Sequence, residues 1–154
     1  MAQWNISPLT APPKVIVNYC SDGSLAPVYT YISNSAKTYN TALDAGVLTE
    51  ILAVSGAGVV DLALVYKTDV TERAITLKVV IDGVTAFNAT SAADTTANNA
   101  LIAVGIYSRT DGTLNGGGIN PQPMVFNSSL SISIKSSIGE VSGKLVTNIS
   151  YRTI

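Results

Sequence analysis

The sequence predicts an all-β protein, a jelly-roll-like antiparallel β-sandwich with an extended N-terminal arm. Short runs in which apolar and polar residues alternate with a period of two are bounded by Gly, Pro, Asn and Asp, which is the pattern of strands and turns. Charged residues make up 12% of the 154 residues, where about 25% is usual. Ser, Thr and Asn take the place of Lys and Glu, as expected of a sheet-rich chain whose surface is to be covered.

Residues 1–13 differ from the rest and predict an extended arm. Three prolines, Pro8, Pro12 and Pro13, disfavour both a helix and a central strand there. The apolar side chains set among them are candidate anchors for a binding partner: Trp4, Ile6 and Leu9. Such an arm could equally cover one end of its own domain. We assign residues 14–154 to a single β-sandwich domain.

The clearest hairpin lies in the middle of the chain. Ile75–Ile81 alternates with a period of two, Asp82-Gly83 follows, and Val84–Phe87 forms the second strand. A two-residue Asp-Gly turn between such runs is the strongest short-range hairpin signal. The expected register places Ile81 opposite Val84 and Val79 opposite Ala86.

Two further hairpins are predicted. Val47–Val54 and Val59–Tyr66 flank Ser55-Gly56-Ala57-Gly58, and the alternating runs 130–135 and 145–151 flank a loop that contains Gly139 and Gly143. Other strands are expected at Val15–Cys20, Val28–Ile32, Leu101–Tyr107 and Met124–Asn127, which gives about eight to ten in all. Only Thr41–Leu48 and Ala92–Leu101 could hold a helical turn. The long links Asp111–Pro123 and Asn88–Asn99 favour a jelly roll over a meander.

The composition argues against catalysis. The chain has no His and a single Cys, Cys20, so it lacks the usual acid–base groups and the ligands of a zinc site. We predict no catalytic, cofactor-binding or metal-binding residues, and no enzymatic activity. Gly116-Gly117-Gly118 lacks the Lys and helix of a phosphate loop. The acidic residues Asp69 and Glu72, beside Arg73, predict a solvated loop.

Charge and hydropathy also limit the partners. No basic run marks a nucleic-acid surface, and no apolar run is long enough to span a membrane. The first residues show no leader pattern, so we expect synthesis in a cytoplasm without an obvious export signal. The low charge favours a surface buried between subunits. The expected partner is therefore the protein itself, as a homo-oligomer.

The stretches Leu52–Leu64 and Thr76–Phe87 carry a resemblance to a known family. In them a Ser-Gly-x-Gly turn precedes a Leu-x-Val-x-Ile-Asp-Gly hairpin, and the pattern is similar to small virion proteins of tailed bacteriophages over about residues 45–108. The resemblance implies a jelly-roll subunit, commonly trimeric, on the outside of the particle. The Pro-rich arm resembles the docking arms of capsid decoration proteins.

Two functional hypotheses follow. In the first, the chain is a capsid decoration (cement) protein located in the virion, which binds the phage major capsid protein from outside and stabilises the shell. In the second, it is a tail or receptor-binding module that recognises host surface carbohydrate, because aromatic residues, here seven Tyr, serve sugar binding when they are exposed as well as subunit contacts.

Overall fold

The fold is described by a computed structural model of the chain, for residues 15–19, 25–29, 33–105 and 124–153. Eleven strands form in this part: β1 (Val15–Tyr19), β2 (Leu25–Tyr29), β3 (Ser33–Tyr39), β4 (Thr49–Ser55), β5 (Gly58–Lys67), β6 (Ile75–Ile81), β7 (Val84–Thr90), β8 (Asn99–Gly105), β9 (Met124–Phe126), β10 (Ser129–Ser136) and β11 (Leu145–Thr153). Neither segment that could have held a helical turn forms an α-helix.

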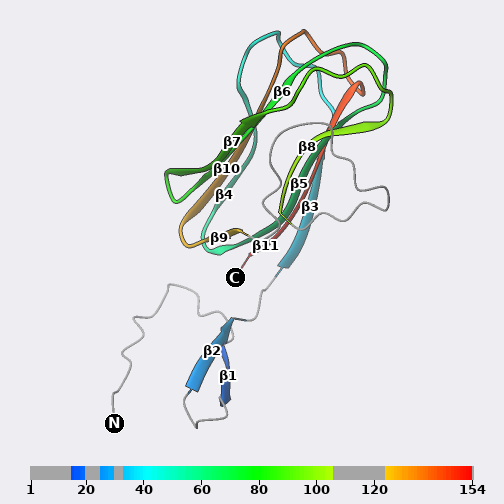
Figure 1. Ribbon diagram of the computed structural model, residues 1–154. Coiled ribbons are helices and arrows are strands. Elements are labelled where there is room, and N and C mark those ends of the chain that lie inside the picture. Colours follow the sequence, from blue (N-terminus) through cyan, green and yellow to red (C-terminus); the bar gives the residue numbers. More distant parts are fainter. Residues whose placement is uncertain (1–14, 20–24, 30–32, 106–123, 154) are drawn as a thin grey trace.

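Two antiparallel sheets face each other and make the sandwich (Figure 1). One has the order β4-β10-β6-β7, and the other has the order β3-β11-β5-β8, with β9 paired to the start of β5. The pairs are nested: β3 pairs with β11, β4 with β10, β5 with β8 and β6 with β7, and successive pairs alternate between the two sheets. This nested double-sheet arrangement is a jelly roll, so the predicted fold class is confirmed.

The core lies between the inward faces of both sheets. On β10, Leu130, Ile132 and Ile134 are at most 1% exposed and alternate with half-buried Ser131, Ser133 and Lys135. Each fully buried aliphatic side chain of this kind contributes about 1.5–3 kcal/mol relative to exposure. The opposite sheet contributes Val60, Ala63 and Val65 from β5 and Leu101, Ile102 and Val104 from β8.

The Asp-Gly hairpin is confirmed, with a one-residue correction. Asp82 and Gly83 have φ values of 51° and 79°, as a two-residue turn of type I′ requires. Ile81 pairs with Val84 as predicted, but Val79 pairs with Phe87 instead of Ala86. A β-bulge in β7 inserts Ala86 as an extra residue, which brings Phe87 over the core.

The other two predicted hairpins are wrong. β4 and β5 follow each other along the chain but lie in opposite sheets, and the same is true of β10 and β11. Alternation and a Gly-containing turn are common to a hairpin and to a corner that crosses the core, so local sequence does not separate them. At the first corner, a Cβ atom on Gly58 would lie 2.2 Å from the carbonyl oxygen of Arg152, so this glycine lets β5 enter between its neighbours.

The N-terminal strands form a separate hairpin. β1 and β2 pair with each other and with no strand of the two sheets (Figure 1). β1 matches the expected strand at Val15–Cys20, whereas β2 begins three residues before the expected Val28. The arm 1–13 and the link Asp111–Pro123 lie outside the described residues, so the boundary between arm and sandwich domain stays a prediction.

Candidate assembly surface

The predicted anchors Trp4, Ile6 and Leu9 lie outside the described residues, as does Cys20. Within the part that the structure describes, no group of three or more His, Cys, Asp or Glu side chains converges as it would to hold a metal ion. No helix in that part is long and apolar enough to cross a membrane. The candidate sites in this part are therefore the outer faces, the sheet edges and the buried polar groups.

The outer face of the four-stranded sheet is rich in hydroxyl groups. The pairing registers place its residues in three rows across the strands: Ala53, Ser131, Val80 and Thr85; Glu50, Ser133, Lys78 and Asn88; and Lys135, Thr76 and Thr90. The Oγ atom of Ser131 donates to Oε2 of Glu50 at 2.5 Å, and the hydroxyls of Thr76 and Thr90 lie 2.8 Å apart. Ser and Thr make up five of these eleven residues, and their hydroxyl groups cost less to desolvate than the charges of Glu50, Lys78 and Lys135.

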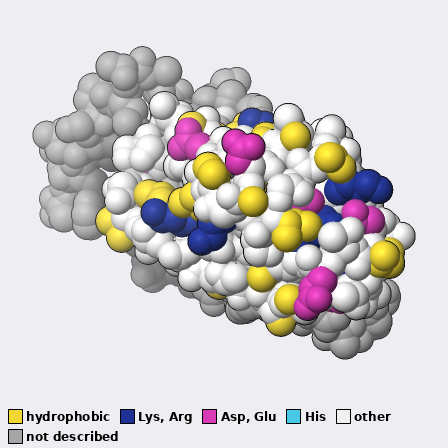
Figure 2. Space-filling view, turned by 90° about the horizontal axis from the view of Figure 1, so that it is seen from above, with side chains coloured by type: hydrophobic (Ala, Val, Ile, Leu, Met, Phe, Trp, Pro, Cys, Tyr) yellow, Lys and Arg dark blue, Asp and Glu magenta, His cyan; other side chains and the backbone are white. Residues whose placement is uncertain are grey.

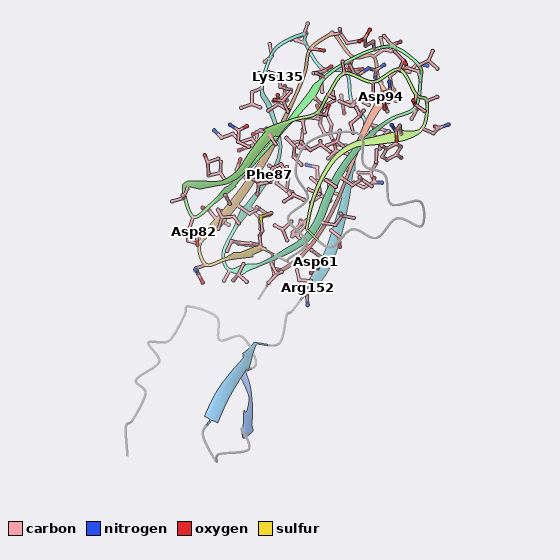
Figure 3. The ribbon with its side chains drawn as sticks, in the orientation of Figure 1. Asp61, Asp82, Phe87, Asp94, Lys135 and Arg152 are labelled. Atoms are coloured by element: carbon pink, nitrogen blue, oxygen red, sulfur yellow. The ribbon has the colours of Figure 1, made fainter. Side chains whose placement is uncertain are left out.

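β7 forms the free edge of this face and carries no charged residue (Figure 3, near Phe87). Within the described residues no strand pairs with its outer side, and Val84 is 69% exposed. A free strand edge presents unpaired N–H and C=O groups, which charged side chains normally shield. The bulge at Ala86 is the one protective feature of β7 that the structure describes.

The other three edges are protected differently. β4 carries Glu50 and a bulge, β3 carries exposed Lys37, and every residue of β8 is buried. β7 is therefore the edge best suited to pairing with another chain. We call β7, with its free edge and its outward-facing side chains, the assembly surface.

The described surface has even fewer charges than the composition suggests. Lys67, Arg73 and Glu140 are at most 5% exposed. Arg152 and Asp61 neutralise each other through two hydrogen bonds, at 2.9 and 2.6 Å (Figure 3). The charged side chains that are exposed in the described ranges are those of Lys37, Asp44, Glu50, Glu72 and Lys144.

The loop near Asp69 corrects a prediction. Arg73, expected in a solvated loop, is 2% exposed. Its guanidinium donates to Oε2 of Glu140 at 2.9 Å and also pairs with Asp69. Desolvation opposes ionisation of Asp69, but the Arg73 charge and the hydrogen bonds from Thr71 and Arg73 outweigh it and lower the pKa of that carboxyl. Oε1 of Glu140 accepts from the Ser136 hydroxyl at 2.5 Å.

This ionic group ties together the loops at one end of the sandwich. Exposed apolar side chains also occur there, at Val47, Leu48, Val70 and Val141. Figure 2 looks down on this end and shows hydrophobic atoms dispersed among uncharged and charged ones. Apolar residues scattered singly are normal on a protein surface, so this end is a weaker candidate for an interface than the assembly surface.

Sequence reasoning missed the buried Lys67, although a signal was present. The period of two that directs Ala63 and Val65 inward continues to Lys67. Glu140 and Arg73 had no such signal, because they lie in loops whose packing depends on other segments.

No family model matches the sequence, and no curated protein matches it. Among solved structures, the chain is similar to the infectious bursal disease virus VP2 subviral particle, with a TM-score of 0.39, 16% identity, and coverage of 96% of this chain and 37% of that chain. Particles of T=1 type derived from the same virus match with a TM-score of 0.35 and 17% identity, over 96% and 36%. The T13 particle of this virus matches with a TM-score of 0.31 and 15% identity, over 97% and 40%. The chain spans well under half the length of these viral capsid proteins.

Proposed function

We propose that this chain is a structural virion protein: a homotrimer that binds the outside of a phage capsid, through the major capsid protein, and stabilises the shell. A fold by itself does not define a function, and jelly rolls also occur in lectin domains. The observation that carries the proposal is the assembly surface, an uncharged free strand edge beside a hydroxyl-rich face. Interface cores are similarly depleted of charge.

The geometry of β7 constrains how copies can associate. Two identical edges that pair with each other close as a two-fold dimer. A trimer requires the β7 edge of one copy to meet a different part of the next copy. Each shell-bound trimer would then present several copies of the same attachment site, and effective concentration multiplies the affinity of a single site.

The assembly surface can be tested with two matched variants. Ala53 and Thr85 are both exposed and occupy the same row of the same sheet, on the opposite edges β4 and β7. Thr85→Lys places a charge on the edge that we assign to assembly, and Ala53→Lys places the same charge on the other edge. We expect light scattering to give three times the chain mass of 16.0 kDa for the unmodified protein and for Ala53→Lys.

Thr85→Lys should lower the mass at micromolar concentration, with an unchanged circular dichroism spectrum. If the unmodified protein is a monomer, the proposal is wrong. If it is a dimer, the trimer is wrong, and two β7 edges that pair with each other explain the mass. If the two lysine substitutions change the mass equally, β7 is not the interface.

A further inference from the structure

A buried amine, a buried side-chain amide and a carboxylate meet where β5 ends and β8 begins. Lys67 and Asn99 are direct cross-strand partners in the pairing of these strands, and they are 0% and 5% exposed. Fully buried lysines are rare. Nζ of Lys67 donates to the main-chain oxygen of Thr71 at 3.3 Å and to that of Asp94.

Asp94 connects the two side chains. Its main-chain oxygen accepts from Lys67, and its carboxylate oxygen Oδ2 accepts from Nδ2 of Asn99. The other carboxylate oxygen, Oδ1, accepts from the backbone N–H of Thr96 at 2.7 Å, which fixes the orientation of the carboxylate. Figure 3 places Asp94 at the end of the sandwich where β8 begins.

We propose that Lys67 and Asn99 form an intramolecular isopeptide bond, with Asp94 as the catalytic proton carrier. The Lys67 ammonium transfers a proton to the Asp94 carboxylate, and the neutral amine attacks Cγ of Asn99. A bond forms between Nζ and Cγ, and the bond between Cγ and Nδ2 breaks. Nδ2 takes the proton held by Asp94 and a second proton from Nζ, and it leaves as an ammonium ion, so the neutral protein loses the mass of one ammonia. Asp94 returns to its carboxylate form, and no oxidant or reductant is needed.

Three features of the fold favour this reaction. The Cβ atoms of directly opposed residues in an antiparallel pair lie about 4.5–5.5 Å apart, a span that a folded lysine chain joined to an asparagine can bridge. Burial excludes the water that would compete with the amine for Cγ. The paired strands hold the reactants in place, so the reaction is intramolecular and its entropy cost is low.

The bond would lock two strands that are far apart along the chain. Residues 67 and 99 enclose the whole β6–β7 hairpin, so the cross-link closes a loop through both sheets. A cross-link of this kind limits the freedom of the unfolded chain, as a disulfide does. It would stabilise the subunit whether or not the protein assembles.

Mass spectrometry of the denatured, purified protein tests the inference. We expect the intact mass to be lower than the sequence mass by one molecule of ammonia. Trypsin should fail to cleave after Lys67 and should yield a branched peptide that joins the segment of Lys67 to the segment of Asn99. A succinimide at Asn115-Gly116 would remove ammonia too, but it leaves Lys67 free, so the branched peptide is the decisive observation.

Variants test the isopeptide bond and the role of Asp94 separately. Asn99→Ala and Lys67→Arg should restore the full mass of their own sequences, whereas Asn98→Gly, one residue away at an exposed position, should remain cross-linked. Asp94→Asn should leave Lys67 and Asn99 unlinked. An unmodified protein with its full sequence mass and a cleavable Lys67 would overturn the proposal. A cross-linked Asp94→Asn protein would overturn the role of Asp94.

Discussion

At the scale of single residues, Gly58 and Asp82 hold the end of the sandwich where β5 starts. Gly58 lies between the carbonyl of Arg152 and the ring of Phe126, which is fully buried. Asp82 occupies the β6–β7 turn and accepts backbone hydrogen bonds from Ser129, Asn127 and Ser128, at 3.0, 2.9 and 2.7 Å respectively. The β6–β7 turn and the β9–β10 turn are therefore joined through one carboxylate.

Gly58→Ala should destabilise the fold. The added Cβ would lie 2.2 Å from a backbone oxygen and 2.5 Å from the Phe126 ring, and neither can move without disturbing β11 or the core. Overpacking of this kind costs about 1–3 kcal/mol. Gly139→Ala is the control, since its nearest atom would be 3.9 Å away, and we expect a change within about 0.5 kcal/mol. Denaturant unfolding measures both, and equal costs would show that the close approach at Gly58 is unimportant.

Asp82→Asn should lower stability at neutral pH and matter less in acid. The hydrogen bonds from Ser129, Asn127 and Ser128 hold the pKa of Asp82 well below its ordinary value of 3.8. A carboxyl with a lowered folded-state pKa stabilises the protein above its unfolded-state pKa, and this contribution is lost as the pH falls below about 4. The difference in melting temperature between the two proteins should therefore shrink from pH 7 to about pH 3. A difference that stays constant with pH would contradict this account.

At the scale of elements, the loops at the other end of the sandwich act as one unit. The N–H of Leu43 donates to the carbonyl of Glu140 at 3.0 Å, and the N–H of Glu140 returns a bond to Leu43 at 2.8 Å. The N–H of Thr68 donates to the carbonyl of Lys144 at 3.0 Å. The Arg73–Glu140 ion pair lies beneath these contacts, so it links the loop after β5 to the loop before β11.

Breaking this buried pair should cost far more than breaking an exposed one. Glu140→Gln leaves the Arg73 charge buried with Asp69 as its remaining carboxylate partner among the ion pairs described. Loss of one partner from a buried pair costs about 3–5 kcal/mol, and we expect the lower end because Asp69 stays. Asp61→Asn breaks the Asp61–Arg152 pair, whose side chains are 22% and 33% exposed, and should cost at most about 1 kcal/mol. Thermal unfolding measures the loss of stability in both variants. Similar losses for Glu140→Gln and Asp61→Asn would show that burial of the Arg73–Glu140 pair does not raise its contribution.

At the scale of the whole molecule, the nested topology gives the two ends of the sandwich different roles. Ser33 pairs with Thr153, so the chain enters the sandwich at β3 on the end where β11 finishes. The ionic loops lie at the opposite end. We therefore expect that a segment preceding β3 could bind a capsid without displacing any strand of the sandwich.

Removal of the arm should abolish attachment and leave the subunit folded. The prolines of residues 1–13 disfavour a place in the sheet, and tryptophan is enriched among residues whose truncation costs at least about 2 kcal/mol of binding energy. We expect deletion of residues 1–13, or Trp4→Ala, to weaken binding to capsids at least about thirtyfold. Sedimentation with purified particles measures this, and Gln3→Ala is the control. Truncated protein that still decorates particles at the unmodified level would refute the arm as the attachment, and binding to a glycan instead of capsids would favour the receptor module.

Local sequence was sufficient for most of the strands and for one hairpin, but it missed β3. Alternation located the core residues of β6 and β10, because a period of two fixes which side chains share a face of a strand. The Asp82-Gly83 turn was predictable because a two-residue turn of this composition holds two strands in one sheet by its own backbone geometry. The low charge of the chain likewise followed from composition alone.

Only the tertiary structure decided how the strands pair across long distances. β4 pairs with β10 and β5 with β11, partners separated by dozens of residues, and the turn between β4 and β5 is a corner because these long-range pairs are the ones formed. The bulge at Ala86, the burial of Arg73 and the meeting of Lys67 with Asn99 have the same origin. Each depends on which distant segment lies opposite, and no periodicity within a single segment records that information.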